Sequence, residues 1–295
     1  MLQLNSATGY SSRFHATDRY LDRIDSLPPV PTVAIQLLDQ FNDPDRDLDR
    51  IVQLISHDPS LTAETLKRCN SGALVGAEPA SDMFEAVCRL GLFEVYSIVV
   101  GLVASRTMKP NDKCKLDSLR LWRHSVTTAV ICATLARRSD LPDATAFTAG
   151  LLHDIGKLIL GSTEGGKYCE LVHQSAFYGP SLIAAEVAKT GFSHATLGAR
   201  LLARWGLPEV VCCAVEWHPQ LPAVIEGDPH LTAIVNFSNS LAHELVEGTT
   251  GAPAAVAISA EAMRLLNLTP EELPALLTEI NLGMQRVQGL MQMQG

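Results

Sequence analysis

Apolar residues recur at helical spacing through most of the chain. Leu48, Ile51, Val52 and Ile55, for example, form an i, i+3, i+4, i+7 stripe of the kind that faces a protein core. Turn residues and helix caps separate one stripe from the next. Together they predict helices at about 33–41, 48–55, 59–69, 82–90, 92–104, 117–136, 143–154, 181–190, 194–205, 208–217, 231–246 and 270–280.

Several boundaries of these helices carry capping signals. Asp58 before Pro59 is typical of an N-cap followed by proline at the first helical position. Ser81 and Asp143 can cap the helices that follow them. The run Thr269-Pro270-Glu271-Glu272 has the pattern of a capping box and opens an amphipathic helix near the end of the chain.

No segment alternates apolar and polar residues for long enough to predict a strand. Residues 92–104 are apolar on nearly all sides, which favours a central buried helix. The β-branched run Ile98-Val99-Val100 keeps a strand open there as an alternative. The stretches from Lys109 to Lys115 and from Gly161 to Gly166 are expected to be loops. The predicted fold class is therefore all-α.

The pattern divides the chain into four regions. Residues 1–18 are polar and small and are expected to form a flexible N-terminal tail. Residues 19–115 form a first helical subdomain, which Leu27-Pro28-Pro29-Val30-Pro31 enters in an extended conformation. Residues 116–247 form a second helical subdomain. Residues 248–295 supply C-terminal helices that pack either on the same chain or on a second copy, which would make a homodimer.

Composition and charge restrict the classes of partner. The chain has 295 residues, of which 47% are apolar and 19% charged, so it can bury a core. The net charge of −9 argues against adhesion to nucleic acid or anionic lipid, and we expect no DNA partner and no membrane partner. Ile98–Ala104, the longest apolar stretch, is too short to span a bilayer, and the first residues do not have the pattern of a secretory signal. Seven scattered cysteines without a CxxC pair indicate reduced thiols and a cytoplasmic location.

Charge is unevenly distributed along the sequence. Residues 18–64 carry ten acidic side chains and four basic ones, whereas residues 106–138 carry eight basic and two acidic ones. Two solvated faces would explain this distribution. The alternative is a basic rim beside a phosphate- or nucleotide-binding pocket, in which Arg120 and Arg123 would flank His124.

The strongest chemical signal is Gly150-Leu151-Leu152-His153-Asp154-Ile155-Gly156-Lys157. An adjacent His-Asp pair in an otherwise apolar helix is unusual, because a buried charge is costly unless it is paired or bound to a metal. An imidazole and a carboxylate from one helical turn can reach one divalent ion, and the carboxylate can bridge to a second. Lys157 can neutralise a phosphate or hold Asp154 in place. A buried structural pair is the alternative.

Further ligands must come from distant helices, and the candidates are His124, His194, His218 and Asn239. Each has a structural interpretation as well. His124 alone would be an ordinary, partly buried histidine, and His194 a helix cap or first-turn residue. His218 precedes Pro219 and can simply end a helix, and Asn239 can be a hydrogen-bonding amide in the core.

These residues, in this order, resemble the HD superfamily of metal-dependent phosphohydrolases, whose ligands correspond to His124, His153-Asp154 and residue 239. His194 and His218 resemble the additional ligands of the HD-GYP cyclic-dinucleotide phosphodiesterases. A narrower resemblance, over roughly residues 20–245, is to the HDOD family, the HD-related output domain of bacteria. It is carried by Leu27-Pro28-Pro29-Val30-Pro31, Asp58-Pro59-Ser60-Leu61-Thr62, Asn70-Ser71, Ala86-Val87-Cys88-Arg89-Leu90-Gly91, Gly150 to Lys157, and Leu197-Gly198-Ala199 through Trp205-Gly206-Leu207-Pro208.

The resemblance implies an HD-domain-like helical bundle with an N-terminal helical HDOD subdomain. It also implies a divalent metal site (Fe, Mn, Zn or Mg), at partial occupancy or none, with six candidate ligands: His124, His153, Asp154, His194, His218 and Asn239. Asp154 and Lys157 would take the catalytic roles, and Lys157 and Arg123 would bind the phosphate of a nucleotide ligand.

Two departures from the catalytic relatives bear on activity. Asn239 stands where those enzymes carry an aspartate. An amide oxygen ligates without charge, so metal affinity and the activation of bound water should fall. Trp217 stands where the HD-GYP enzymes have the first of two paired histidines, and tryptophan cannot ligate a metal. The GYP signature is absent from the sequence.

Three functions therefore stay open. The departures favour a regulatory module that acts through contacts with unidentified signalling proteins and has no catalysis. The second is a metal-dependent phosphohydrolase acting on a nucleotide or cyclic nucleotide through a metal-bound hydroxide. In the third, the pocket binds a nucleotide or a metal as a signal without reacting with it.

Overall fold

The computed structural model describes residues 16–22, 32–71, 80–107, 117–177, 181–222, 224, 227–247 and 258–287. Over these residues the chain is built from helices and contains no β-strand, which confirms the all-α fold class. The strand alternative for residues 98–100 is wrong, because they lie within one continuous helix.

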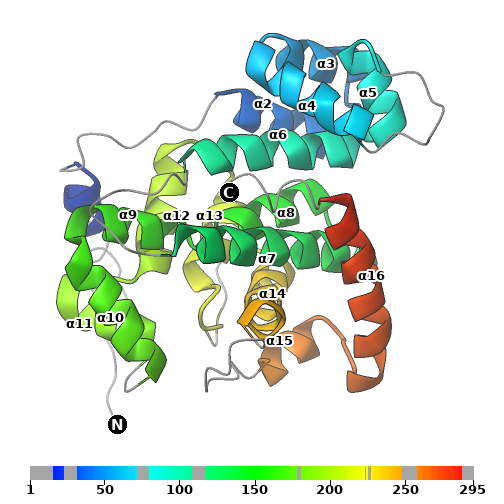
Figure 1. The fold of residues 1–295 in the computed structure, drawn as a ribbon. Coiled ribbons are helices and arrows are strands. Elements are labelled where there is room, and N and C mark those ends of the chain that lie inside the picture. The colour runs from blue at the N-terminus through cyan, green and yellow to red at the C-terminus, as the bar shows by residue number, and fades with distance from the viewer. Residues whose placement is uncertain are drawn as a thin grey trace.

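An N-terminal lobe of four short helices lies on a fifth, longer helix (Figure 1). The four are α2 (Thr32–Asn42), α3 (Leu48–Ser56), α4 (Pro59–Ser71) and α5 (Met83–Leu90), and the fifth is α6 (Leu92–Thr107). Leu37, Ile51 and Leu61 are almost completely buried. The apolar stripes in the sequence thus face one shared core.

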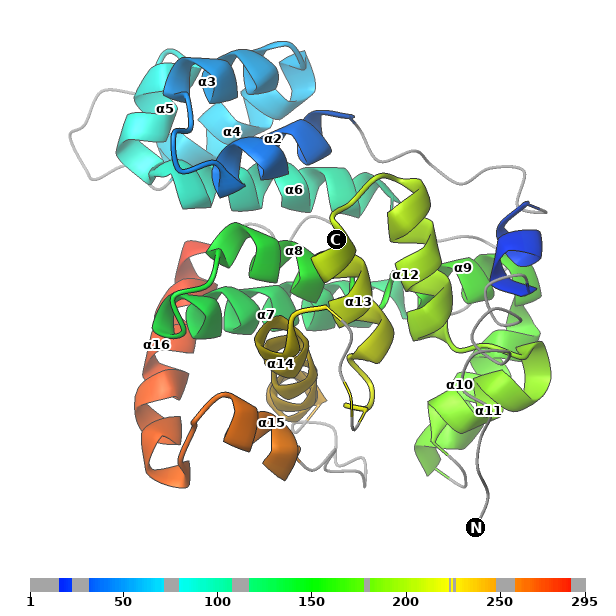
Figure 2. The ribbon, with the colours of Figure 1, turned by 180° about the vertical axis from the view of Figure 1, so that it is seen from behind.

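The second lobe is arranged around α7 (Ser118–Arg138), in which the residues from Trp122 to Ala136 are buried apart from the exposed Arg123. α7 packs against α8 (Asp143–Leu152) and α14 (Pro229–Glu247), and α12 (His194–Arg204) packs against α9 (Ile155–Glu164) and α13 (Glu209–Trp217). An outer pair, α10 (Gly166–Phe177) and α11 (Leu182–Thr190), projects away from the N-terminal lobe in both ribbon views (Figures 1 and 2).

The two lobes meet where α2 and α6 contact α8. At the centre of this contact the hydroxyl groups of Tyr96 and Thr148 form a buried hydrogen bond. At its edge the Thr145 hydroxyl donates to Asn42 Oδ1 at 2.8 Å. The lobes therefore join through an apolar seam that also contains specific polar contacts.

The C-terminal helices pack on the second lobe of the same chain. α15 (Ala260–Leu265) contacts α14, and α16 (Leu273–Arg286) lies against α7. The predicted capping box is present, since Thr269 and Glu272 cap the 3₁₀ turn Pro270–Glu272 that precedes α16. The Arg138 guanidinium on α7 donates two hydrogen bonds, of 3.0 and 2.9 Å, to the Glu279 carboxylate on α16.

Four local predictions were wrong. The N-cap of α5 is Asp82 instead of Ser81, because the Asp82 carboxylate accepts from the Glu85 N–H. Residues 161–166 are almost wholly helical, with Gly165, at φ 58°, dividing α9 from α10. Residues 16–18, assigned to the flexible tail, are helical, and Asp18 binds Arg200 at 2.7 Å.

The fourth error concerns the helix predicted at 143–154, which ends at Leu152. Its N-cap is Pro142 and Asp143 is its first residue, so Asp143 does not cap it. The predicted loop from Lys109 to Lys115, the proline-rich entry at 27–31 and the 115/116 boundary lie outside the described residues.

Among the described residues, no single helix is long and apolar enough to cross a membrane. α5 and α6 meet that test only when joined across a bend of 113°.

Candidate metal centre

His153 and Asp154 form the break between two helices. His153 is the C-cap of α8, and Asp154, with φ −99° and ψ 10°, precedes the first residue of α9. The chain turns at this point, so both side chains project into the space between α7, α12 and α13. Both residues are at most 1% exposed. A histidine can be buried at a helix end because the last carbonyl groups of the helix are free to accept hydrogen bonds from side chains. Here the Gly150 carbonyl oxygen lies 2.7 Å from His153 Nδ1.

Two glycines allow the neighbouring helices to approach this break closely. A Cβ atom at Gly150 would stand 2.9 Å from Ala129 Cα on α7. A Cβ atom at Gly156 would stand only 1.9 Å from the carbonyl oxygen of His194 on α12. Because these contacts are with backbone atoms, a side chain at either position would separate the helices that carry the candidate ligands.

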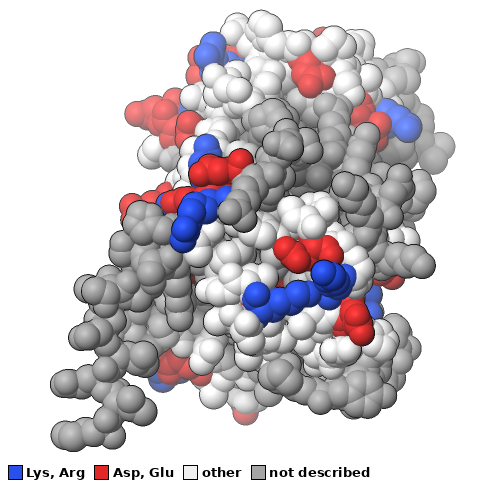
Figure 3. All heavy atoms as spheres, turned by 90° about the vertical axis from the view of Figure 1, so that its left-hand side faces the viewer, with Lys and Arg blue, Asp and Glu red and all other residues white. Residues whose placement is uncertain are grey.

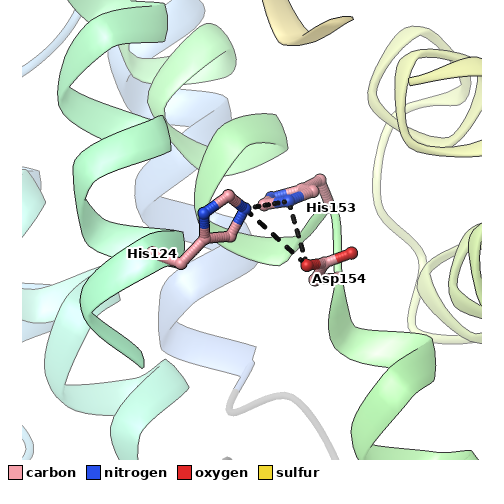
Figure 4. A group of neighbouring side chains, drawn as sticks. All are labelled: His124, His153 and Asp154. Atoms are coloured by element: carbon pink, nitrogen blue, oxygen red, sulfur yellow. Dashed lines mark hydrogen bonds and ion pairs between the residues drawn. The ribbon is translucent and has the colours of Figure 1, made fainter. Parts of the chain in front are cut away.

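The first group of candidate ligands is His124, His153 and Asp154 (Figure 4). His124 Nε2 lies 3.1 Å from His153 Nε2 and 3.8 Å from Asp154 Oδ2, and His153 Nε2 lies 3.3 Å from the same oxygen. Asn239 Oδ1 lies 3.0 Å from His124 Nε2 and so borders this group. Two separate segments, α7 and the α8–α9 break, thus converge on Asp154 Oδ2, and α14 borders them through the contact of Asn239 with His124.

The second group shares Asp154 and uses its other oxygen. His194 Nε2 lies 3.2 Å from Asp154 Oδ1, and His218 Nε2 lies 3.6 Å from it. His194 is the first residue of α12, where Ser193 is the N-cap, and His218 is the C-cap of α13. All four histidines are at most 3% exposed. The carboxylate of Asp154 therefore lies between two pairs of imidazoles.

In three of the four histidines the outer ring nitrogen already has an acceptor. Nδ1 of His153 lies 2.7 Å from the Gly150 carbonyl oxygen, and Nδ1 of His218 lies 2.7 Å from that of Val215. Nδ1 of His194 lies 2.8 Å from Glu186 Oε2. An acceptor at Nδ1 assigns a proton to that nitrogen, so in the neutral ring the Nε2 lone pair points inward. Metal-ligating histidines are oriented in the same way.

For His124, His218 and Asp154, the pKa directions favour the protonation states that a metal ligand needs. Burial keeps the pKa of His124 well below its ordinary value and lowers that of His218 to about 3, so both rings are neutral. Burial alone would raise the pKa of Asp154, but His153 and Lys157 outweigh it and hold this pKa well below its usual range. A neutral imidazole and an ionised carboxylate are the forms that bind metals.

His194 differs from the other rings in its charge environment. Burial alone would lower its pKa, but the adjacent Glu186 carboxylate raises it above the ordinary value. Glu186 in turn has a lowered pKa, because the charge and hydrogen bonds of His194 and a hydrogen bond from Tyr168 overcome the effect of burial. The two groups therefore form a buried, charge-complementary pair.

The chemistry of these groups fits a divalent metal. Asp154 Oδ1 and His194 Nε2 are buried and 3.2 Å apart, yet neither makes a hydrogen bond of acceptable geometry. Buried polar atoms in proteins are almost always hydrogen-bonded, so two such atoms facing each other need an explanation. A cation between them would satisfy both. Imidazole-rich sites with one carboxylate suit Zn, Fe or Mn better than Mg, which prefers oxygen ligands.

The remaining predicted site residues fall into two groups. Lys157 lies beside the cluster, with Nζ 2.7 Å from Asp154 Oδ2 and a side chain 16% exposed, so it contacts both Asp154 and solvent. Arg123 is exposed on α7, and the described contacts of the cluster do not include it. The structure therefore brings together all six predicted ligands and Lys157, but not Arg123.

The structure describes only part of the predicted basic rim, because Lys109, Lys113 and Lys115 lie outside the described residues. Arg137 pairs with Asp143 at 2.8 Å and lies over the Phe93 ring, and Arg138 pairs with Glu279. The face that carries α9 to α12 shows acidic and basic side chains side by side (Figure 3). Arg137 and Arg138 are thus paired with acidic side chains, and the phosphate-binding rim stays a prediction for the rest of the segment.

Two buried residues next to the cluster were not predicted from the sequence. Glu186 on α11 is fully buried, and its carboxylate accepts from the His194 backbone N–H at 2.8 Å as well as from Nδ1. The hydroxyl of the buried Tyr168 on α10 donates to Glu186 Oε1 at 2.6 Å. The available signal was a single acidic residue in the small, apolar run Ile183-Ala184-Ala185-Glu186-Val187-Ala188.

A further contact that supports the cluster lies on α14. The Asn236 side chain donates from Nδ2 to the carbonyl oxygen of His218 at 2.8 Å. The amide thus fixes the end of α13, where His218 enters the cluster. Asn236 lies one turn before Asn239, so one face of α14 supports both groups of candidate ligands.

Comparison with proteins of known sequence and structure identifies relatives of this chain. A protein of unknown role from Treponema pallidum is 29% identical over 220 residues, which is 74% of this chain and 42% of that protein. This chain thus spans less than half the length of that relative. The structure of an HDOD domain protein of unknown function from Geobacter sulfurreducens is 23% identical with a TM-score of 0.70, covering 94% of this chain and 99% of that one.

Two further solved structures share the fold. One, from Shewanella amazonensis and provisionally named a phosphohydrolase, is 21% identical with a TM-score of 0.70, covering 94% of this chain and 98% of that one. Another, from Marinobacter aquaeolei and provisionally named a signal transduction protein, is 23% identical with a TM-score of 0.72, covering 99% of this chain and 67% of that one. The HDOD domain model matches residues 27–221. The chain belongs to the HDOD domain family.

Proposed function

We propose that this chain is a signalling protein whose core binds one or two divalent metal ions around Asp154, and that it acts through contacts with other proteins and not by catalysis. The observation that supports this most directly is the inward orientation of the imidazole Nε2 atoms of His153, His194 and His218 toward one carboxylate. A polar cluster with a purely structural role would satisfy its own donors and acceptors. In this cluster Asp154 Oδ1 and His194 Nε2 lie 3.2 Å apart, but no hydrogen bond of good geometry satisfies either atom.

The ligand set argues for binding more strongly than for catalysis. Asn239 gives the first group of ligands an uncharged oxygen, so Asp154 is the only carboxylate among the six candidates. A divalent ion would keep more of its positive charge and be held less tightly than at a site with two carboxylates. The cluster is also almost entirely buried, which suits a metal that stabilises a conformation.

Metal content is the first measurement. The protein is purified without a metal-affinity tag or chelator, and Zn, Fe and Mn are quantified in the wild type and in His153→Ala and Asp154→Ala. We expect about one or two equivalents in the wild type and a loss in both variants. His230→Ala is the control, since that side chain is 57% exposed and remote from the cluster. Metal well below one equivalent in a folded wild type would contradict the proposal.

A metal-dependent phosphohydrolase is the second candidate, and Lys157 is the observation that favours it. Its Nζ is 2.7 Å from Asp154, and its side chain is partly exposed, so it could exchange this ion pair for a phosphoryl oxygen. A bound metal would supply the activated hydroxide and the Lewis acid. The protein's own residues would position the phosphate through Lys157 and hold the metal through Asp154.

Asn239→Asp separates the two candidates. This change restores a charged oxygen 3.0 Å from His124 Nε2. If the chain is a hydrolase with a weakened site, hydrolysis of nucleotide and cyclic-nucleotide esters should appear in the variant and vanish when Asp154→Asn is added. If the wild type already turns over these esters, the non-catalytic proposal is wrong. If the variant binds metal and remains inactive, the signalling role is supported.

A further inference from the structure

The α10–α11 pair is attached to the rest of the second lobe through few contacts. α10 packs to a similar extent on α11 and on α9 (Figures 1 and 2). On the side facing the end of α13, a cavity of about 370 Å³ separates α11 from that helix. Ile183 and Val187 line it from α11, and Trp217 and Leu221 line it from the opposite wall. Side chains that line such an open pocket have fewer packing partners, so α11 is held there by less dispersion energy than a core helix.

Glu186 supplies the polar connection across this weakly packed boundary. It is fully buried, and its carboxylate accepts two hydrogen bonds from His194, one from the backbone N–H and one from Nδ1. Its other oxygen accepts from Tyr168 on α10. One carboxylate thus links α10 and α11 to the first residue of α12. That residue is also a candidate metal ligand.

The chemistry of imidazole makes this link sensitive to a metal. A cation bound at Nε2 withdraws electron density from the ring, which makes Nδ1–H a stronger donor to a carboxylate. On the basis of the proposed function, we propose that Glu186 is a positioning residue for His194 and that through it metal binding fixes the α10–α11 pair in place. The backbone mobility of α10 and α11 would then differ between the metal-free and the metal-bound protein.

Linkage requires the reverse effect as well. If metal binding stabilises the contact between Glu186 and His194, then losing that contact must weaken metal binding by the same factor. Removing the outer partner of a metal-ligating histidine typically lowers metal affinity about 10- to 100-fold. Glu186→Gln is the appropriate change, because the amide keeps the shape of the side chain and removes its charge.

The test measures metal affinity and backbone mobility together. Zn²⁺ or Mn²⁺ is titrated into the metal-free protein by calorimetry, and amide hydrogen exchange of residues 166–177 and 182–190 is followed with and without the metal. We expect the wild type to bind metal and to slow exchange in both helices. Glu186→Gln should bind about 10- to 100-fold more weakly, and its α10–α11 exchange at saturating metal should stay fast.

Two further variants keep the result interpretable. Glu170→Gln is the matched control, since Glu170 is exposed on α10 and contacts Gln174 instead of the site. It should behave as the wild type does. Tyr168→Phe keeps Glu186 in place and removes one of its hydrogen bonds. It should weaken the metal-dependent protection of α10 even if Glu186→Gln fails to fold.

The outcomes separate this inference from the function on which it rests. If the wild type binds no metal, both are overturned. If the wild type binds metal but exchange in α10 and α11 does not respond, the coupling is overturned and the metal site stands. Equal affinities in the wild type and a folded Glu186→Gln variant would likewise overturn the positioning role.

Discussion

Gly156 lies so close to the backbone of His194 that a Cβ atom added at residue 156 would stand 1.9 Å from the His194 carbonyl oxygen. This contact sets the spacing of α9 and α12, and Asp154 and His194 lie at the adjoining ends of these two helices. The geometry of the candidate metal centre therefore depends on the absence of one methyl group.

Gly156→Ala should disturb both stability and the site. Overpacking in a closely packed core costs about 1–3 kcal/mol, and a clash with backbone belongs at the upper end of that range. We expect a loss of about 3 kcal/mol in urea unfolding and a loss of metal binding in the protein that remains folded.

Gly166→Ala is the matched control for this change. Nothing lies within 4 Å of a Cβ atom at residue 166, the first residue of α10. Alanine there should leave stability unchanged or raise it by about 0.4–1 kcal/mol, because it restricts the unfolded chain. Equal stabilities of the two variants would show that the contact between Gly156 and His194 does not constrain the fold.

The helices could be predicted from local pattern, because their stripes and caps depend on residues three or four positions apart. Asp58, for instance, caps α4 as expected, with Oδ1 accepting from the Ser60 N–H at 2.8 Å. The break at His153 could not be predicted in this way, because the flanking sequence is continuously apolar. His153 itself keeps helical dihedral angles of −54° and −36°. The backbone leaves the helical conformation only at Asp154, where φ is −99° and ψ is 10°.

The candidate ligands of the site could be predicted from the sequence, but the residues that hold these ligands in place could not. The order of His124, His153, Asp154, His194 and His218 along the chain indicated a shared cluster, and the structure brings them together. Glu186 gave no comparable signal, because its partner His194 lies in the next helix and the contact arises only from tertiary packing. Outer hydrogen-bond partners of ligands have no fixed spacing in sequence.

Metal binding should raise the thermal stability of the wild type. A ligand that binds the folded state alone stabilises it by RT ln(1 + [L]/Kd), or about 2.7 kcal/mol at a hundredfold excess over Kd. We expect Zn²⁺ to raise the melting temperature of the wild type and to leave that of Asp154→Asn unchanged, because Asp154 is common to both candidate ligand groups.

Asp140→Asn is the matched control for the thermal measurement. Asp140 is exposed in a turn at φ 54°, a conformation that asparagine also adopts readily. This variant should respond to Zn²⁺ as the wild type does. A metal-induced shift of similar size in Asp154→Asn would mean that the ion binds elsewhere.

The seam between the lobes should depend on Tyr96. Its hydroxyl forms a buried hydrogen bond with Thr148, so Tyr96→Phe removes that bond where water cannot replace it. Thr148 keeps its own bond to the Ala144 carbonyl oxygen at 2.9 Å, which limits the penalty. We expect a loss of about 1 kcal/mol in urea unfolding.

Tyr20→Phe makes the same chemical change at a more exposed position, where the hydroxyl contacts Thr163 and Glu164. Water can replace those bonds, so the loss should be smaller. If Tyr20→Phe cost as much as Tyr96→Phe, the hydrogen bond across the seam would not account for the effect.

The attachment of α16 to α7 should weaken in acid. The hydrogen bond and charge of Arg138 lower the pKa of Glu279 below its ordinary value of 4.5. A carboxyl group with a lowered folded-state pKa adds stability above its unfolded pKa and loses it as the pH falls through the folded value. Since Glu279 is 47% exposed, the contribution at neutral pH is at most about 0.5 kcal/mol.

Urea unfolding of the wild type and Glu279→Gln, at neutral pH and at a pH below the folded pKa, measures this contribution. The wild type should be the more stable protein at neutral pH, and the difference should disappear in acid because both side chains are then uncharged. Glu271→Gln, on the exposed turn before α16, should match the wild type at both pH values. A difference that persists in acid would assign the role of Glu279 to packing and not to its charge.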